Sequence, residues 1–194
     1  LDPNHRPSRV YRHRLGDDPA SDALVFEESD PGFFVGIGKT ESRSHIVIDC
    51  HDHETSECWL IDAHLPESAP ALVAPRVRGE RYDVSEHDGR LIILTNAGAA
   101  EDFKIVAAPV ATPGRDHWRD IVPHQPGRYI LTTEVYGDYL ARLERVDALL
   151  RIVVRPWTDG TEYHVAFDEE AYSLGLEGSY EYRAATLRFS YSSM

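Results

Sequence analysis

Four short runs, FFVGIG (33–38), HIVIDC (45–50), CWLID (58–62) and ALV (71–73), decide the fold of this chain. Each run is rich in β-branched, aromatic or other apolar residues, and segments that contain Gly, Ser, Asp or Pro separate one run from the next. Runs of this length and composition, bounded by turn residues, are typical of β-strands. The stretch therefore predicts four successive antiparallel strands.

Runs of the same kind follow one another along the whole chain. They lie at 10–15, 23–26, 82–85, 91–95, 103–108, 118–122, 131–136, 139–143, 149–155, 162–167, 172–176 and 186–191. Only residues 141–151 carry some helical pattern, and Val146-Asp147-Ala148 within them reads equally well as a hairpin turn. We therefore predict an all-β protein.

The order of the strands repeats. Cycles of four strands begin at Phe33, Tyr82, Leu131 and Tyr172, and a repeat of about 40–50 residues is typical of a propeller blade. The two ends of the chain supply only two strands each. The sequence therefore predicts a partial β-propeller of four-stranded antiparallel blades, whereas a sandwich with the same strands would not predict the repeat. We place a half-blade at 1–30, full blades at 31–78, 79–126 and 127–168, and a half-blade at 169–194.

Composition excludes several classes of function. The 194 residues include 33 acidic and 20 Lys and Arg side chains, a net charge of −13, so we expect no nucleic acid as partner, because the chain would repel phosphates. No apolar stretch approaches the roughly 18–20 residues of a membrane helix, and no signal peptide is visible, so we expect no membrane partner. Cys50 and Cys58 are too few for a disulfide scaffold. They predict reduced, half-buried thiols in a cytoplasmic protein.

The sequence carries no motif for catalysis or for a cofactor. Ser179, in Gly178-Ser179-Tyr180, lacks the second glycine of G-x-S-x-G, and Gly36 and Gly38 lie in a strand without the helix that a dinucleotide site needs. A P-loop and a C-x-x-C pair are also absent from the sequence. We therefore assign no catalytic, cofactor-binding or metal-binding residue and expect no cofactor.

Three polar clusters remain as candidates for chemistry. In Asp49-Cys50-His51-Asp52-His53-Glu54, two histidines and several carboxylates could bind a divalent ion, but a polar hairpin turn explains the same residues. Glu27-Glu28 and Asp168-Glu169-Glu170 are interpreted as solvated turns, with attraction of cationic peptides as the alternative. We expect the other histidines to be solvated or hydrogen-bonded; these are His5, His13, His64, His87, His117, His124 and His164.

Many local segments together resemble one family, although no single motif is specific. They begin with VYRHRLG (10–16) and DALVFEE (22–28) and end with LRFSYSSM (187–194). Between them lie FFV (33–35), KT (39–40), TSE (55–57), LID (60–62), APR (74–76), YDV (82–84), LTN (94–96), Phe103, WR (118–119), VPH (122–124), AFD (166–168) and AY (171–172). The chain thus resembles, over essentially its whole length, the β-propeller domain of oligopeptidase B (protease II) in the prolyl oligopeptidase family of serine peptidases.

This resemblance implies a seven-bladed propeller that caps an α/β-hydrolase domain and keeps folded proteins from the active site. It implies cleavage of short peptides after Arg or Lys by a Ser-Asp-His triad located C-terminal to the propeller, with no counterpart here. We therefore expect the chain to be an inactive gating part of such a peptidase, with the hydrolase domain as its partner and short basic peptides as substrates of the parent.

The residues themselves suggest two other hypotheses about function. A stand-alone propeller-like scaffold that binds proteins is the alternative, and a metal-dependent hydrolase or lyase would rest on His51 and His53 alone. The half-blades also suggest a homodimer, since pairing them across two chains would complete two composite blades and cover exposed strand edges. Pairing them within one chain would instead need a tightly curved four-bladed ring.

Overall fold

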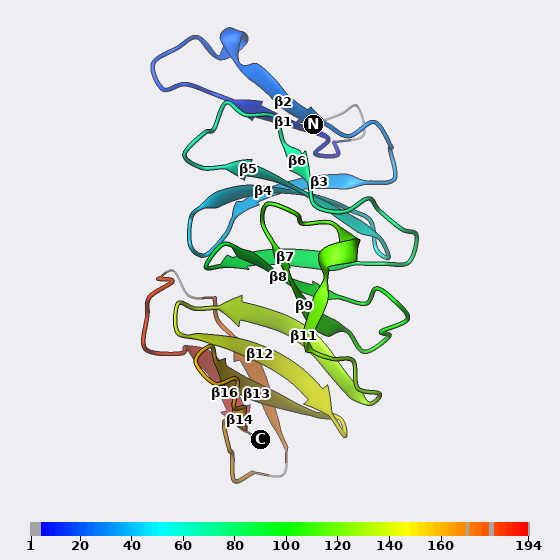
Figure 1. Cartoon of the computed structure of the whole chain (residues 1–194), viewed down its shortest axis with the longest axis vertical. Helices are drawn as coiled ribbons and strands as arrows, with labels where there is room; N and C mark the ends of the chain where they lie inside the picture. Colours follow the sequence, from blue (N-terminus) through cyan, green and yellow to red (C-terminus); the bar gives the residue numbers. More distant parts are fainter. Residues whose placement is uncertain (1–4, 170, 179–180, 194) are drawn as a thin grey trace. The chain divides into compact units, whose positions relative to one another are not determined.

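The computed structural model describes residues 5–169, 171–178 and 181–193 of the chain. The chain forms two compact units, Leu1–Tyr82 and Asp83–Met194. Figure 1 shows that the regular secondary structure consists almost entirely of strands. Two 3-10 turns, η1 (Pro19–Ser21) and η2 (Arg115–His117), are the only helical elements among the described residues. The prediction of an all-β protein is therefore confirmed, and no described helix is long and apolar enough to cross a membrane.

The first unit contains a two-stranded and a four-stranded antiparallel sheet. In the smaller sheet, β1 (Arg9–Arg12) pairs with β2 (Ala23–Glu27). The larger sheet has the order β3 (Phe34–Lys39), β4 (His45–His51), β5 (Ser56–Asp62) and β6 (Ala71–Leu72). Each strand neighbours the one before it because short turns join them.

Side chains that point to the inner face of the strands form the core of the first unit. Ile48 and Cys50 of β4 are fully buried together with Phe33, Val35 and Ile61. Partly buried side chains of β1, β2 and β5 pack against this cluster; they are Val10, Val25, Phe26 and Trp59. The small sheet therefore packs on one face of the large one.

The second unit repeats this plan. One sheet has the order β10 (Arg119–Val122), β9 (Lys104–Pro109), β8 (Arg90–Thr95) and β7 (Tyr82–His87), whose first residue closes the first unit. The next has the order β11 (Arg128–Val135), β12 (Tyr139–Val146), β13 (Leu149–Pro156) and β14 (Tyr163–His164). A two-stranded sheet of β15 (Tyr172–Leu176) and β16 (Phe189–Ser193) follows. Three four-stranded and two two-stranded sheets confirm the predicted fold class, while the predicted blade limits stay a prediction.

The ambiguous segment at 141–151 is a hairpin. β12 and β13 pair in register from Tyr139↔Pro156 to Val146↔Leu149. Asp147 and Ala148 form the turn with positive φ angles of 51° and 68°. Two successive residues with positive φ are the geometry that the right-handed twist of a tight hairpin requires. The helical pattern is therefore overridden by cross-strand pairing.

Two strands and two thiols differ from the expectation. The strand predicted at 162–167 is reduced to β14, and Val165 and Phe167 beyond it pack against a buried cluster that includes Leu143 and Ile152. The strand predicted at 186–191 is shifted to β16. Cys50 and Cys58 are not joined in a disulfide, and they are fully rather than half buried, at 0% and 2% exposure.

Candidate functional site

The hairpin between β4 and β5 holds the histidines that the sequence singles out. His51 Nδ1 lies 2.8 Å from Asp49 Oδ2 on the same strand, and its ring stacks on Phe34 of the neighbouring strand at 6.2 Å between centroids. Asp49 pairs in register with Gly36, where a Cβ atom would lie only 2.3 Å from Asp49 Oδ1. The absence of a side chain at Gly36 therefore gives Asp49 the space from which it holds His51.

The turn itself follows from hydrogen bonds of Asp52. Its Oδ1 accepts the backbone N–H groups of Glu54 at 2.7 Å and Thr55 at 2.6 Å, an Asx turn of the kind that aspartate side chains form. The bond from Glu54 is the main reason why the pKa of Asp52 is lowered. His53 is exposed. Among the residues that the structure describes, no group of three or more His, Cys, Asp or Glu is placed to hold a metal ion.

The acidic pair at the end of β2 splits into two different environments. Glu27 is exposed and forms an ion pair with Arg9 at 2.7 Å. Glu28 is only 7% exposed, and its Oε2 binds Arg76 Nη2. The interpretation of Glu28 as part of a solvated turn is therefore wrong, because a cation 48 residues away in sequence buries it as an ion pair.

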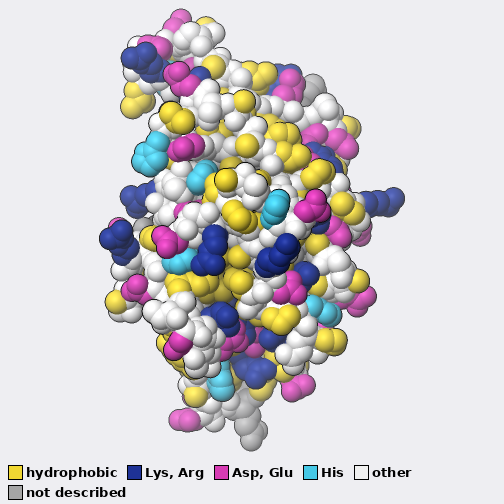
Figure 2. All heavy atoms as spheres, viewed as in Figure 1, with side chains coloured by type: hydrophobic (Ala, Val, Ile, Leu, Met, Phe, Trp, Pro, Cys, Tyr) yellow, Lys and Arg dark blue, Asp and Glu magenta, His cyan; other side chains and the backbone are white. Residues whose placement is uncertain are grey.

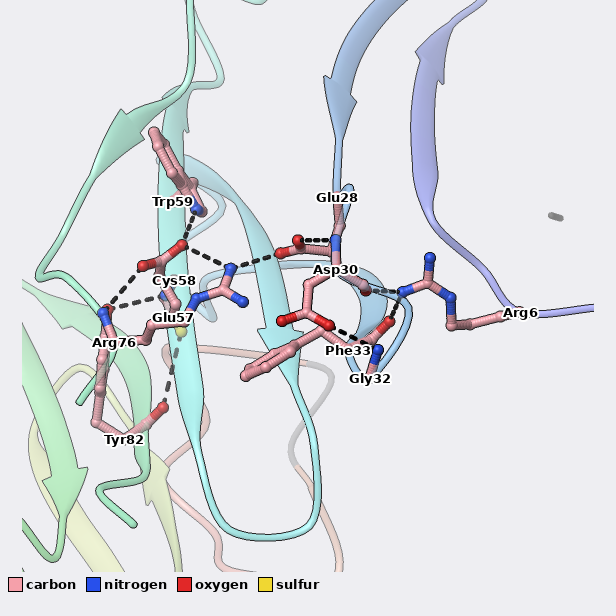
Figure 3. A network of polar contacts seen from close by, with 10 residues as sticks. All are labelled: Arg6, Glu28, Asp30, Gly32, Phe33, Glu57, Cys58, Trp59, Arg76 and Tyr82. Atoms are coloured by element: carbon pink, nitrogen blue, oxygen red, sulfur yellow. Dashed lines mark hydrogen bonds and ion pairs between the residues drawn. The ribbon is translucent and has the colours of Figure 1, made fainter. Parts of the chain in front are cut away.

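Arg76 is the centre of a buried polar network (Figure 3). Besides Glu28, its guanidinium binds Glu57 Oε1 at 3.1 Å, and its backbone N–H donates to Glu57 Oε2 at 2.9 Å. The guanidinium carbon lies 4.0 Å from the centre of the Phe33 ring, a cation–π contact. Burial opposes the charge, but the bonds to Glu57 and Glu28 outweigh it and raise the pKa of Arg76. Arg76 thus links the β1–β2 sheet to the β3–β6 sheet.

Two further side chains extend this network into the surrounding loops. Arg6 donates to the backbone oxygens of Asp30 and Phe33, which fixes the segment that enters β3. Tyr82 is 1% exposed, accepts the N–H of Cys58 at 2.9 Å and donates to the Ala74 oxygen at 2.6 Å. Arg6 and Tyr82 thus hold backbone segments in place, and the network supports the two sheets.

A second cluster lies in the other unit, at the turns that end β7 and β11. His87 is 7% exposed and stacks on Trp157 at 4.3 Å between centroids. Its Nδ1 lies 2.7 Å from the Tyr182 hydroxyl. The backbone oxygen of Tyr182 accepts the N–H of Gly137 at 2.7 Å. Burial lowers the pKa of His87. The predicted hydrogen-bonded histidine therefore has partners 70 to 95 residues away in sequence, which no local pattern indicates.

The remaining sequence candidates do not gather into a site. Asp168 and Glu169 are exposed, while Glu170 and Ser179 lie outside the described residues. The Asp49–His51 pair, the Arg76 network and the His87 cluster are the polar clusters described above. Each of them lies within one of the two units.

Comparison with known proteins places these sheets in a family. The chain matches the family described as "Prolyl oligopeptidase, N-terminal beta-propeller domain" over residues 1–194. It belongs to the prolyl oligopeptidase family. Among curated relatives, it is 36% identical over 188 residues to dipeptidyl aminopeptidase BI of Pseudoxanthomonas mexicana, covering 96% of this chain and 25% of that protein. It is 31% identical over 194 residues to protease 2 of Moraxella lacunata, covering 100% of this chain and 27% of that protein.

Solved structures of the prolyl oligopeptidase family share the fold. Oligopeptidase B from Trypanosoma brucei, in a closed form with covalently bound antipain, matches with a TM-score of 0.90 and 28% identity over 97% of this chain and 28% of its own. Oligopeptidase B from Leishmania major matches with a TM-score of 0.90 and 29% identity over the same shares. The chain therefore spans about a quarter of the length of these relatives, within their N-terminal propeller.

Proposed function

We propose that this chain is the propeller portion of a serine peptidase of the oligopeptidase B type, which cleaves short peptides after Arg or Lys. The observation that carries the proposal is the TM-score of 0.90 over 97% of the chain against two oligopeptidase B structures at 28% and 29% identity. A prolyl endopeptidase matches less well, with a TM-score of 0.81 at 20% identity, which shows a shared fold alone.

In this proposal the chain gates access and leaves the chemistry to a C-terminal α/β-hydrolase domain. The described polar clusters hold strands and turns together, which supports a scaffold role. The net charge of −13 favours cationic peptides near the propeller. Two buried thiols that form no disulfide support a reducing compartment, and we place the protein in the cytoplasm. Fractionation of the source cells would overturn that location if the protein were found outside the cytoplasm.

The test uses the full-length protein and residues 1–194 side by side. A blocked peptide that ends in Arg and carries a fluorogenic leaving group is compared with the same peptide ending in citrulline, which has similar shape but no charge. We expect the full-length protein to cleave only the Arg peptide and to react with a fluorophosphonate probe for active serines. Residues 1–194 should do neither. Turnover by residues 1–194, or equal cleavage of both peptides, would contradict the proposal.

A second candidate function follows from the relative at 36% identity, which is named a dipeptidyl aminopeptidase. An enzyme of that kind removes dipeptides from a free N-terminus. The same assay distinguishes the two, since a free-amino dipeptide reporter would be cleaved and the blocked Arg peptide would not. Cleavage of the blocked peptide favours the endopeptidase.

The scaffold hypothesis and the dimer hypothesis can be tested without a substrate. A stand-alone scaffold requires that the gene ends at Met194, which sequencing of the source gene decides. The proposed dimer through the half-blades requires that residues 1–194 sediment as two copies at micromolar concentration. A monodisperse monomer would overturn the dimer without affecting the peptidase assay.

A further inference from the structure

The sheet β11–β14 carries an excess of positive charge, part of it buried. Arg142, whose side chain is 3% exposed, binds Glu144 at 2.8 Å and Glu162 through two parallel bonds of 2.8 Å. Arg155 also binds Glu162, at 3.2 Å, and donates to the Gly160 oxygen at 2.8 Å. Both glutamates are therefore already paired by these two arginines.

Two further arginines of the same sheet compete for Glu144. Arg128 and Arg151 each place Nε 3.9 Å from a Glu144 oxygen, beyond hydrogen-bond distance. Both Nε atoms are buried and have no hydrogen-bond partner among the described residues. Burial, and then the neighbouring Arg142, lower the pKa of Arg128. Four guanidiniums thus share two carboxylates in a chain whose net charge is −13.

A hollow of about 300 Å³ opens beside this cluster and is lined by side chains from β8, β9, β10 and β13. Arg155 belongs to the cluster and also lines the hollow. Arg90 of β8 is a second arginine in the lining. Arg90 is exposed, and its guanidinium forms no ion pair with a carboxylate of the residues that the structure describes. The one acidic group in the lining, Asp159, accepts the N–H of Thr161 at 2.9 Å.

The floor of the hollow is apolar. Ile92 and Ala107 are 2% and 8% exposed, and Ile121 and Trp157 pack against the same core. Figure 2 shows Lys, Arg, Asp and Glu side chains interspersed with hydrophobic ones on the visible face of the molecule. A site with an apolar floor and an unpaired guanidinium recognises a ligand that has an anionic group next to an apolar one.

We propose that this hollow binds a separate peptide that presents a carboxylate beside an apolar side chain. The carboxylate is received by Arg90, whose planar guanidinium suits two parallel bonds to it. The apolar side chain lies on Ile92, Ala107 and Trp157. The positive excess at Arg128, Arg142, Arg151 and Arg155 adds a local field that favours the anion. Binding in this hollow requires no cleavage of the peptide. The binding proposal is therefore independent of the proposed peptidase function.

The test is a titration of the full-length protein with two matched peptides. The probes are acetyl-Leu-Glu-Leu amide and acetyl-Leu-Gln-Leu amide, which differ in charge and not in length, and neither contains Arg or Lys. Calorimetry should give a dissociation constant about tenfold smaller for the Glu peptide, as expected for a charge-assisted pair. Raising NaCl from about 0.05 to about 0.5 M should reduce this preference.

Variants decide whether the hollow is the site. Arg90→Gln should abolish the preference for the Glu peptide. Arg145→Gln is the matched control, because Arg145 is exposed and lies on the same sheet as Arg155 but outside the hollow, and it should keep the preference. Absence of binding, equal binding of both peptides, or a preference that survives Arg90→Gln would overturn the proposal. A dimer that Arg90→Gln dissociates would also overturn it, because a second copy would then occupy the hollow.

Discussion

Arg76 shows how one side chain can join two sheets. Its guanidinium is held between Glu28 at the end of β2 and Glu57 of β5, over the ring of Phe33. Removing one partner of a buried ion pair is costly, because the remaining charges stay buried without compensation. The exposed pair of Arg9 with Glu27 near the same strand lacks this property. The two arginines therefore form a natural comparison.

We expect Arg76→Met to lower the free energy of unfolding by about 3 kcal/mol, because Glu28 and Glu57 lose their common cation. Arg9→Met, which breaks only the exposed pair, should cost less than about 1 kcal/mol. Urea unfolding of both variants and of the parent protein measures these values. Similar losses for the two variants would show that the buried network does not stabilise the fold.

His87 gives stability a dependence on pH. Burial lowers its pKa in the folded protein, whereas the unfolded chain has the ordinary value of about 6.5. The unfolded state therefore takes up a proton first as pH falls, so stability is present above about pH 6.5 and decreases below it. Glu86, Asp88 and Asp138 oppose this shift, and Arg90 adds to it.

The prediction is tested with His87→Asn, which cannot titrate. The difference in unfolding free energy between parent and variant should shrink as pH falls from about 7.5 to about 5.5. Denaturant titrations at several pH values within this range measure the difference. A constant difference would mean that His87 has the same pKa in the folded and unfolded states.

At the scale of elements, the pairing of β3 with β4 depends on a glycine. Gly36→Ala would place a Cβ atom 2.3 Å from Asp49 Oδ1, which forces Asp49 away from His51. We expect a loss of about 1–3 kcal/mol, as for other overpacked sites. Gly38→Ala on the same strand is the control, because nothing lies within 4 Å of its Cβ position. The double variant with Asp49→Ala should recover much of the loss in thermal unfolding, and no recovery would locate the strain elsewhere.

The β12–β13 hairpin can be improved by the same reasoning. Ala148 has a φ of 68°, a region in which a Cβ atom costs about 1 kcal/mol and glycine does not. Ala148→Gly should therefore raise the free energy of unfolding by up to about 1 kcal/mol, which thermal denaturation would detect. Ala141→Gly, at a buried position inside β12, should instead be destabilising. A destabilised Ala148→Gly variant would contradict the turn geometry.

At the scale of the whole molecule, the sequence alone was sufficient for the repeat but not for the polar clusters. Strands such as Phe34–Lys39 and His45–His51 can be predicted from the sequence, because short apolar runs are followed by turn residues within a few positions. Glu28 meets Arg76 across 48 residues, and His87 meets Tyr182 across 95. Contacts of that separation leave no local periodicity.

The outer strands β6 and β14 are each only two residues long. Each pairs with its neighbour through two residue pairs and then leaves the sheet. Such short outer strands at the rim of these sheets offer a foreign strand little backbone on which to align. In a crowded cell, where many chains pass through partly unfolded states, such a rim resists edge-to-edge aggregation. A protein built almost wholly of β-strands thus avoids uncontrolled growth of these sheets by other chains.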